Sequence, residues 1–227
     1  MDDQSGSAGA PVKVWDLPTR LFHWSLVLLV CFSWWSGEQG GGWLKWHFLS
    51  GYAVLSLLLF RLTWGFIGSS TARFGQFLKG PKTGLAHLRV LFSAAVPRDF
   101  GHNPVGGWIV IFMLAVLTAQ AGLGLFADDE VARFGPLNGL VSGATAERLT
   151  FLHKIGGKIV LFMVIFHVAA VAIYFIWKRL NLVAPMLSGY SAEKLEPAAA
   201  KFVNPWLALL ILIAAALCVW GIVSLGK

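Results

Sequence analysis

Charged side chains are scarce in this sequence. They make up 13% of its 227 residues, whereas 57% of the residues are hydrophobic and the mean hydropathy is +0.70. That balance excludes an ordinary soluble protein, in which about a quarter of the residues are charged. The hydrophobic residues form runs of about twenty, the length that a helix needs to cross a membrane, whereas barrel strands are shorter and alternate in polarity. The sequence therefore predicts an all-α integral membrane protein.

Cysteine is almost absent, and this limits the cofactor chemistry open to the chain. Cys31 and Cys218 both fall inside hydrophobic runs, and no CxxCH motif occurs. Two isolated cysteines do not form a disulfide framework, and covalent attachment of a c-type haem requires the missing motif. The cysteines are therefore predicted to be thiols that face lipid or the protein core.

Five hydrophobic segments are predicted to span the membrane. Their approximate ranges are 17–36, 43–67, 104–126, 149–177 and 206–225. Asp16 followed by Pro18, and Asn204 followed by Pro205, are typical of helix starts, because an Asp or Asn side chain caps free amides and proline fits the first turn. The first segment lacks a small-residue cleavage pattern, so we expect a retained span rather than a signal peptide.

The net charge of +7 is explained by the loops between the spans. Lysine and arginine are concentrated in the N-terminal segment, in residues 68–103 and after Trp177, whereas the loops near Glu38 and Asp128 contain fewer. By the positive-inside rule the N-terminus is cytoplasmic and the C-terminus lies outside. No nucleic-acid partner is expected, because orientation in the membrane accounts for the charge.

The longest polar region, residues 68–103, is also predicted to contain a helix. Its large apolar residues recur at helical spacing between Phe74 and Phe92, among several lysines and arginines. Such a pattern is typical of a basic amphipathic helix that lies on the membrane surface, here on the cytoplasmic side.

Two histidines on the fourth segment, His153 and His167, are the strongest functional signal. They are fourteen residues apart, almost four full helical turns, so both imidazoles leave the same side of one helix about 21 Å apart along its axis. A histidine is costly to leave unpaired in hydrocarbon, and two on one stripe suggest ligands at two depths in the membrane.

The first and second segments supply a histidine at each matching depth. His23 lies near the cytoplasmic face, at the depth of His167, and His47 lies near the outer face, at the depth of His153. Each pair is predicted to share a site. The remaining histidines, His87 and His102, fall in the basic region, where a surface position is expected, although either could line a quinone pocket or donate a proton to it.

Facing neutral imidazoles inside an apolar helix bundle most often bind haem b. A zinc ion would need further nitrogen, sulfur or carboxylate ligands, and a proton relay would need Asp or Glu at depth, yet the spans supply neither. We therefore predict two haems b, each with bis-histidine iron ligation. Glycines near the ligands, Gly51 and Gly156, are expected to leave room where a flat macrocycle approaches the backbone.

The haem propionates need cationic or hydrogen-bonding partners, and four cations lie near the predicted ligands. They are Arg20, Arg61, Lys154 and Lys158. For Arg20, Arg61 and Lys154, an equally good explanation is a residue at a span end that reaches out to water. Lys158 lies deeper, which favours a propionate contact.

Four motifs in the chain are distinctive: DLPTRLFHW, WHFLSGY, GHNPVGGW and LHKIGGK. Over roughly Val14 to Arg179 the sequence resembles the bacterial cytochrome b561 and nickel-iron hydrogenase b-type cytochrome family. The resemblance implies a dihaem cytochrome of the bacterial inner membrane with a four-helix transmembrane core. It also implies that His23 pairs with His167 and His47 with His153, the pairing that depth already suggests.

This resemblance predicts that the chain divides into three parts. They are a flexible N-terminal tail (1–13), a four-helix transmembrane haem-binding bundle (14–180), and a linker with a fifth transmembrane helix (181–227). The fifth helix has no histidine, so it is expected to pack against the bundle or to dock a partner.

The implied function is transmembrane electron transfer between ubiquinone or menaquinone and a periplasmic c-type cytochrome or hydrogenase-like enzyme. Acidic residues at the outer face, Asp128–Glu130 and Glu147, would steer a basic partner. An alternative is a superoxide:quinone oxidoreductase that acts on its own, and a third is a haem-free membrane anchor. Whether the protein forms a homodimer stays open.

Overall fold

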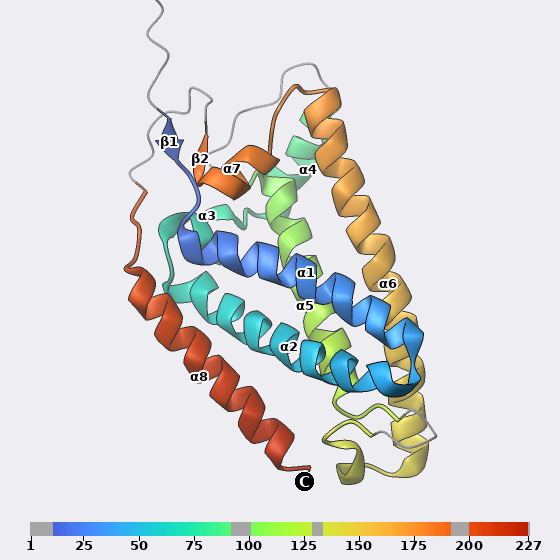
Figure 1. The fold of residues 1–227 in the computed structure, drawn as a ribbon. Helices are drawn as coiled ribbons and strands as arrows, with labels where there is room; N and C mark the ends of the chain where they lie inside the picture. The colour runs from blue at the N-terminus through green and yellow to red at the C-terminus, as the bar shows by residue number, and fades with distance from the viewer. Residues whose placement is uncertain (1–10, 92–100, 129–133, 192–199, 227) are drawn as a thin grey trace, which may run out of the picture.

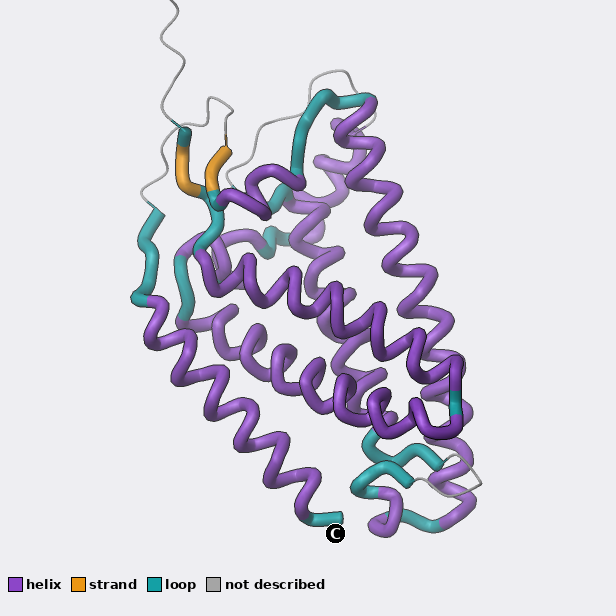
Figure 2. Tube along the Cα trace, in the orientation of Figure 1, coloured by secondary structure: helices purple, strands orange, loops and turns teal. Residues whose placement is uncertain are grey.

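The computed structural model describes residues 11–91, 101–128, 134–191 and 200–226. Within these ranges, five helices are long and apolar enough to cross a membrane, and helix dominates the trace in Figure 2. They are α1 (Leu17–Gln39), α2 (Leu44–Ile67), α5 (Pro104–Gly124), α6 (Gly143–Ile176) and α8 (Pro205–Ser224). The predicted all-α membrane architecture is confirmed.

The predicted helix starts are also confirmed. The Asp16 side chain accepts a hydrogen bond from the Thr19 amide at 2.8 Å, and the Asn204 side chain accepts one from Trp206 at 3.0 Å. Asn103 caps α5 in the same way, through the Gly106 amide. In each case a proline occupies the first turn, where its missing N–H costs nothing.

The spans alternate in direction, which gives the bundle two distinct ends. At the end called proximal here, α1, α5 and α8 begin and α2 and α6 finish; the other end is called distal. Hydrogen bonds join these termini at the proximal end. The Asn103 amide group donates to the Tyr174 hydroxyl at 3.1 Å, and the Ser70 amide donates to the Lys201 carbonyl at 2.9 Å.

A short antiparallel sheet closes the proximal end. Strand β1 (Val12–Lys13) pairs with β2 (Tyr190–Ser191), so the segment before α1 is tied to the segment after α6. Helix α7 (Val183–Ser188) precedes β2 and contacts α1, because the Trp24 indole donates to the Met186 carbonyl at 3.1 Å.

The predicted single surface helix is wrong in detail, because the chain forms two helices there. They are α3 (Phe74–Phe77) and α4 (Pro81–Leu91). The first helix ends at Phe77 and the second begins at Pro81. Proline disfavours helical geometry in the residue before it, so Gly80 cannot join the two helices into one. Phe74 and Phe77 are buried in the main core, and only α4 has the predicted surface position.

Helix α8 lies against α2, on the side of the α1–α2 pair opposite to α6 (Figure 1). Its buried face consists of small and medium residues, Ala208, Ala215 and Val219. Where it begins, the Ser69 hydroxyl accepts a hydrogen bond from the Val203 amide at 3.1 Å. The fifth span is therefore a packing helix on the α2 side of the bundle.

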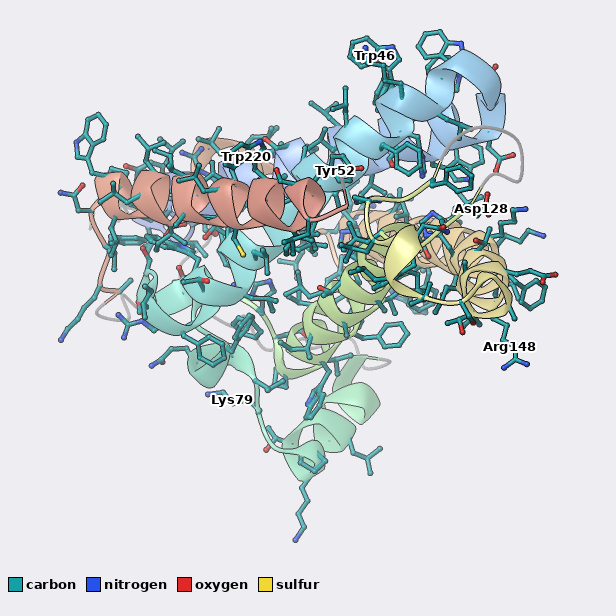
Figure 3. All side chains as sticks on the ribbon, turned by 90° about the horizontal axis from the view of Figure 1, so that it is seen from below. Trp46, Tyr52, Lys79, Asp128, Arg148 and Trp220 are labelled. Atoms are coloured by element: carbon teal, nitrogen blue, oxygen red, sulfur yellow. The ribbon has the colours of Figure 1, made fainter. Side chains whose placement is uncertain are left out.

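Short 3₁₀ turns complete the described chain: Gly41–Trp43, Ser70–Ala72 and Asn138–Leu140. The surfaces of the spans are apolar, as a lipid-facing exterior requires. Trp46, for example, points away from the bundle in Figure 3 and is 50% exposed. Trp220 on α8 is 67% exposed.

Candidate functional site

A cavity at the distal end is lined by four of the five spans: α1, α2, α5 and α6. His47 from α2 and His153 from α6 both line it, as do Gly51 and Lys154. The rest of its wall is mainly apolar. The structure thus brings together the two histidines that were matched by depth in the sequence.

The two imidazoles have a separation suited to sharing one metal ion. Their ring centroids lie 5.9 Å apart, with an angle of 80° between the ring planes. A metal–imidazole bond is about 2 Å long, so two imidazoles that share one metal ion would have ring centres up to roughly 6 Å apart. The observed separation fits that arrangement.

Both rings are anchored through Nδ1 to a neighbouring helix. His47 Nδ1 donates to the Ser33 carbonyl on α1 at 2.7 Å, and His153 Nδ1 donates to the Gln120 carbonyl on α5 at 3.0 Å. A proton on Nδ1 leaves the Nε2 lone pair available for a metal ion, and such a bond also orients the ring and raises its basicity.

Two glycines that sequence analysis missed allow these anchors to form. An added Cβ at Gly37 would lie 2.9 Å from His47 Nδ1, and one at Gly124 would lie 3.0 Å from His153 Cε1. Larger residues there would push the rings away from their carbonyl partners. No local signal marks these glycines, since each contacts a histidine of another helix.

The two glycines predicted to leave room for a macrocycle differ in their surroundings. A Cβ at Gly51 would meet nothing, as expected beside a cavity. A Cβ at Gly156 would overlap Oε1 of Gln120. In the structure Gly156 therefore makes room for a glutamine, and its contact with a macrocycle stays a prediction.

The second histidine pair lies toward the proximal end. His23 on α1 and His167 on α6 are close enough to interact electrostatically. His23 Nδ1 is buried and has no hydrogen-bond partner among the described residues. Its ring packs at 89° against Trp24, with the centroids 5.0 Å apart. This pair has an unsatisfied polar atom that the distal pair lacks.

The ligand sets of both sites fit haem better than a simple metal ion. No group of three or more His, Cys, Asp or Glu side chains gathers anywhere in the described ranges. Paired imidazoles are sufficient when a porphyrin supplies the other four ligands, and they are too few for a structural zinc site.

A sequence comparison identifies the family. A family model for prokaryotic cytochrome b561 matches residues 14–189. The chain belongs to the prokaryotic cytochrome b561 family. Neither a curated protein nor a solved structure matches it. Family membership and the five apolar helices make it a multi-pass membrane protein that transfers electrons across the membrane by b-type haem.

In this cytochrome b561, Arg61 is the most deeply placed of the predicted propionate partners. It is only 2% exposed. One guanidinium nitrogen donates to the Ala72 carbonyl at 3.1 Å, and the group lies over the Phe74 ring, 4.9 Å from its centroid. Its Nη1 is buried and has no hydrogen-bond partner within the part of the chain that the structure describes. Arg61 is therefore a buried cation, which excludes the explanation of a span-end residue reaching water.

The other three cations differ from Arg61. Arg20 donates to the Leu187 carbonyl, so it ties α1 to α7. Lys154 lines the distal cavity, whereas Lys158 is not among its lining residues, and both lysines are exposed. Lys154 thus places one cation at the wall of the distal cavity. The propionate contact of Lys158 stays a prediction.

The expected surface position of His102 is wrong. Its ring packs between Trp15 and Phe77, with centroid distances of 4.7 and 4.6 Å. Its Nδ1 is buried and has no hydrogen-bond partner in the described ranges. Burial, reinforced by the charge of Arg61 and by His23, lowers the pKa of His102 to about 3. His102 is therefore a neutral histidine beside the proximal site.

Parts of two predictions lie outside the described residues. Of the acidic cluster, Asp129 and Glu130 are not described, while the Asp128 amide donates to the Thr150 hydroxyl at 2.9 Å and Glu147 is exposed. The His87 side chain is likewise outside the described set.

Proposed function

We propose that this cytochrome carries electrons across the bacterial inner membrane through two b-type haems, between the quinone pool and a periplasmic redox partner. His47 and His153 would hold the distal haem, and His23 and His167 the proximal one. The observation that carries the proposal is the distal pair, whose 5.9 Å ring separation and two Nδ1 anchors suit bis-histidine ligation. Haem b supplies a one-electron couple within the apolar bundle.

Helix α6 is the shared scaffold in this proposal. It contributes His153 and His167, which are separated along the helix by about 21 Å. One rigid helix thereby sets the spacing of the two redox centres. Because α1 and α2 each supply one partner, both centres depend on the packing of the α1–α2 pair beside α6.

The orientation follows from charge. Basic residues outside the spans gather at the proximal end, where they include Lys13, Arg73, Lys79 and Lys178, and the positive-inside rule assigns that end to the cytoplasm. In Figure 3, Lys79 and Asp128 lie on well-separated parts of the molecule. The proximal haem and neutral His102 would then serve a quinone on the cytoplasmic side, and the distal haem would serve a partner in the periplasm.

The test is a redox titration of the purified protein, followed by optical and EPR spectroscopy. Wild type is expected to contain two haems with separable midpoint potentials. His47→Ala and His153→Ala are expected to remove one haem, and His23→Ala and His167→Ala the other. His87→Ala is the matched histidine control. Retention of both haems in any ligand variant would overturn the pairing, and a haem-free wild type would overturn the function.

A second candidate is a superoxide:quinone oxidoreductase that acts without a partner. It is favoured by exposed cations on the distal part of α6, namely Arg148, Lys154 and Lys158, which would attract a small anion. Two superoxide ions would each lose one electron and leave as O₂, and the quinone would take up two electrons and two protons. Purified protein alone should then reduce quinone with superoxide, at a rate that falls with salt and in Lys154→Gln. A strict carrier would show no such turnover.

A further inference from the structure

We propose that Gln120 on α5 is a positioning residue for the distal haem site. It fixes the depth and ring orientation of His153 and thereby sets the redox potential of that haem. This inference rests on the haem assignment proposed above. It assigns a role in the site to α5, which contributes no histidine.

Gln120 and His153 are joined by two hydrogen bonds that run in opposite directions. His153 Nδ1 donates to the Gln120 backbone carbonyl at 3.0 Å, and Gln120 Nε2 donates to the His153 backbone carbonyl at 3.0 Å. The first bond fixes the imidazole ring and the second fixes the backbone that carries it. Neither α5 nor α6 can slide or rotate locally without breaking one of them.

Gly156, one turn beyond His153, provides the space for this contact. A Cβ at position 156 would overlap Oε1 of Gln120, whereas a Cβ at the adjacent Gly157 would lie 3.7 Å from Nε2, an ordinary contact. The Gln120 carboxamide therefore packs directly against the backbone of α6. Gln120 also lines the distal cavity, so its contact with α6 lies beside the proposed cofactor.

The link to redox potential is physical. A hydrogen bond from Nδ1 to a carbonyl increases electron donation by the imidazole, which favours ferric over ferrous iron. Loss of an outer-shell partner of this kind typically costs about 10- to 100-fold in metal affinity or activity. Loss of the bond from Gln120 Nε2 would free the α6 backbone at His153, so the bond from Nδ1 to the Gln120 backbone carbonyl should lengthen. Binding of ferric haem should therefore weaken more than binding of ferrous haem.

The experiment uses two single variants of the full-length cytochrome. Gln120→Leu removes the side-chain donor at similar size, and Gly156→Ala displaces the carboxamide while leaving Gln120 in place. Each is expected to change the ferric-to-ferrous affinity ratio of the distal haem about tenfold, which for one electron is an upward shift of about 59 mV. The distal EPR signal should change, and the proximal haem should keep its potential and spectrum.

Matched controls separate positioning from general loosening. Gly122→Ala makes the same substitution on α5 where a Cβ meets nothing, so both haems should keep wild-type potentials. In a Gln120→Ala background, Gly156→Ala should add no further shift, because the clash it creates needs the glutamine. This double variant also removes any overpacking from the comparison.

Unchanged distal potential and EPR signal in both single variants would overturn the inference. Equal shifts of both haems would also overturn it, since they would indicate general destabilisation. Selective loss of the distal haem, with the proximal haem retained, supports it. A wild-type protein without haem would instead contradict the proposed function, so the two failures are distinguishable.

Discussion

Trp64 on α2 donates its indole N–H to Oδ2 of Asp16 at 3.1 Å, and both side chains are buried. The other carboxylate oxygen of Asp16 caps α1 through the Thr19 amide. Asp16 also interacts electrostatically with the buried Arg61. One carboxylate thus fixes the start of α1 relative to the end of α2 at the proximal site.

Asp16→Ala is expected to destabilise the protein by about 3 kcal/mol. Loss of the cap costs about 1 kcal/mol, and the buried Trp64 donor left without a partner costs about 1–3 kcal/mol more. Thermal loss of haem absorbance in detergent measures the effect. Asp16→Asn keeps the cap and should lose less, so equal losses in the two variants would contradict this account.

Gly37→Ala is expected to weaken the distal haem alone. The new methyl group would lie 2.9 Å from His47 Nδ1 and would push the ring off the Ser33 carbonyl. The loss of this outer-shell bond should cost about 10- to 100-fold in haem affinity. Haem content and distal EPR intensity give the measurement. Gly42→Ala, where a Cβ meets nothing, is the control and should behave as wild type.

Arg61→Met is expected to lower the midpoint potential of the proximal haem. A buried positive charge favours the ferrous state, which carries one positive charge less than the ferric state, and its effect persists in a low-dielectric interior. The shift should be tens of millivolts and nearly independent of salt. A redox titration at two ionic strengths tests this, and an unchanged proximal potential would exclude the contribution of Arg61.

His102 is expected to make the protein sensitive to acid. Its pKa is about 3 in the folded protein and 6.5 in an unperturbed histidine, so the unfolded chain binds the proton more readily. The stability contribution is complete above pH 6.5 and is lost as the pH falls from 6.5 toward 3. Between pH 7.5 and 5.5 the loss should be about 1 kcal/mol.

Comparison of thermal stability at those two pH values, in wild type and in His102→Gln, tests this expectation. The glutamine keeps polarity and approximate size but does not titrate in this range. The variant should therefore lose less stability on acidification. An identical loss in both proteins would show that another group is responsible.

The approach of His47 to His153 could be predicted from the sequence because it follows from one-dimensional spacing. Fourteen residues between His153 and His167 place both on one helix face, and depth in the membrane then restricts the partner of each. The structure brings His47 beside His153 as this reasoning required. The packing of His102 could not be predicted, since it depends on Trp15 and Phe77 from other segments.

The sequence by itself determined the spans, their caps and the helix that carries two of the proposed haem ligands, because hydrophobic length, capping side chains and helical period are local properties of the chain. Only the tertiary structure decided how the ligands are held. Ser33, Gly37, Gly124 and Gln120 gain their roles from close approach between helices, and no spacing within one helix encodes which carbonyl of a neighbour will face an imidazole.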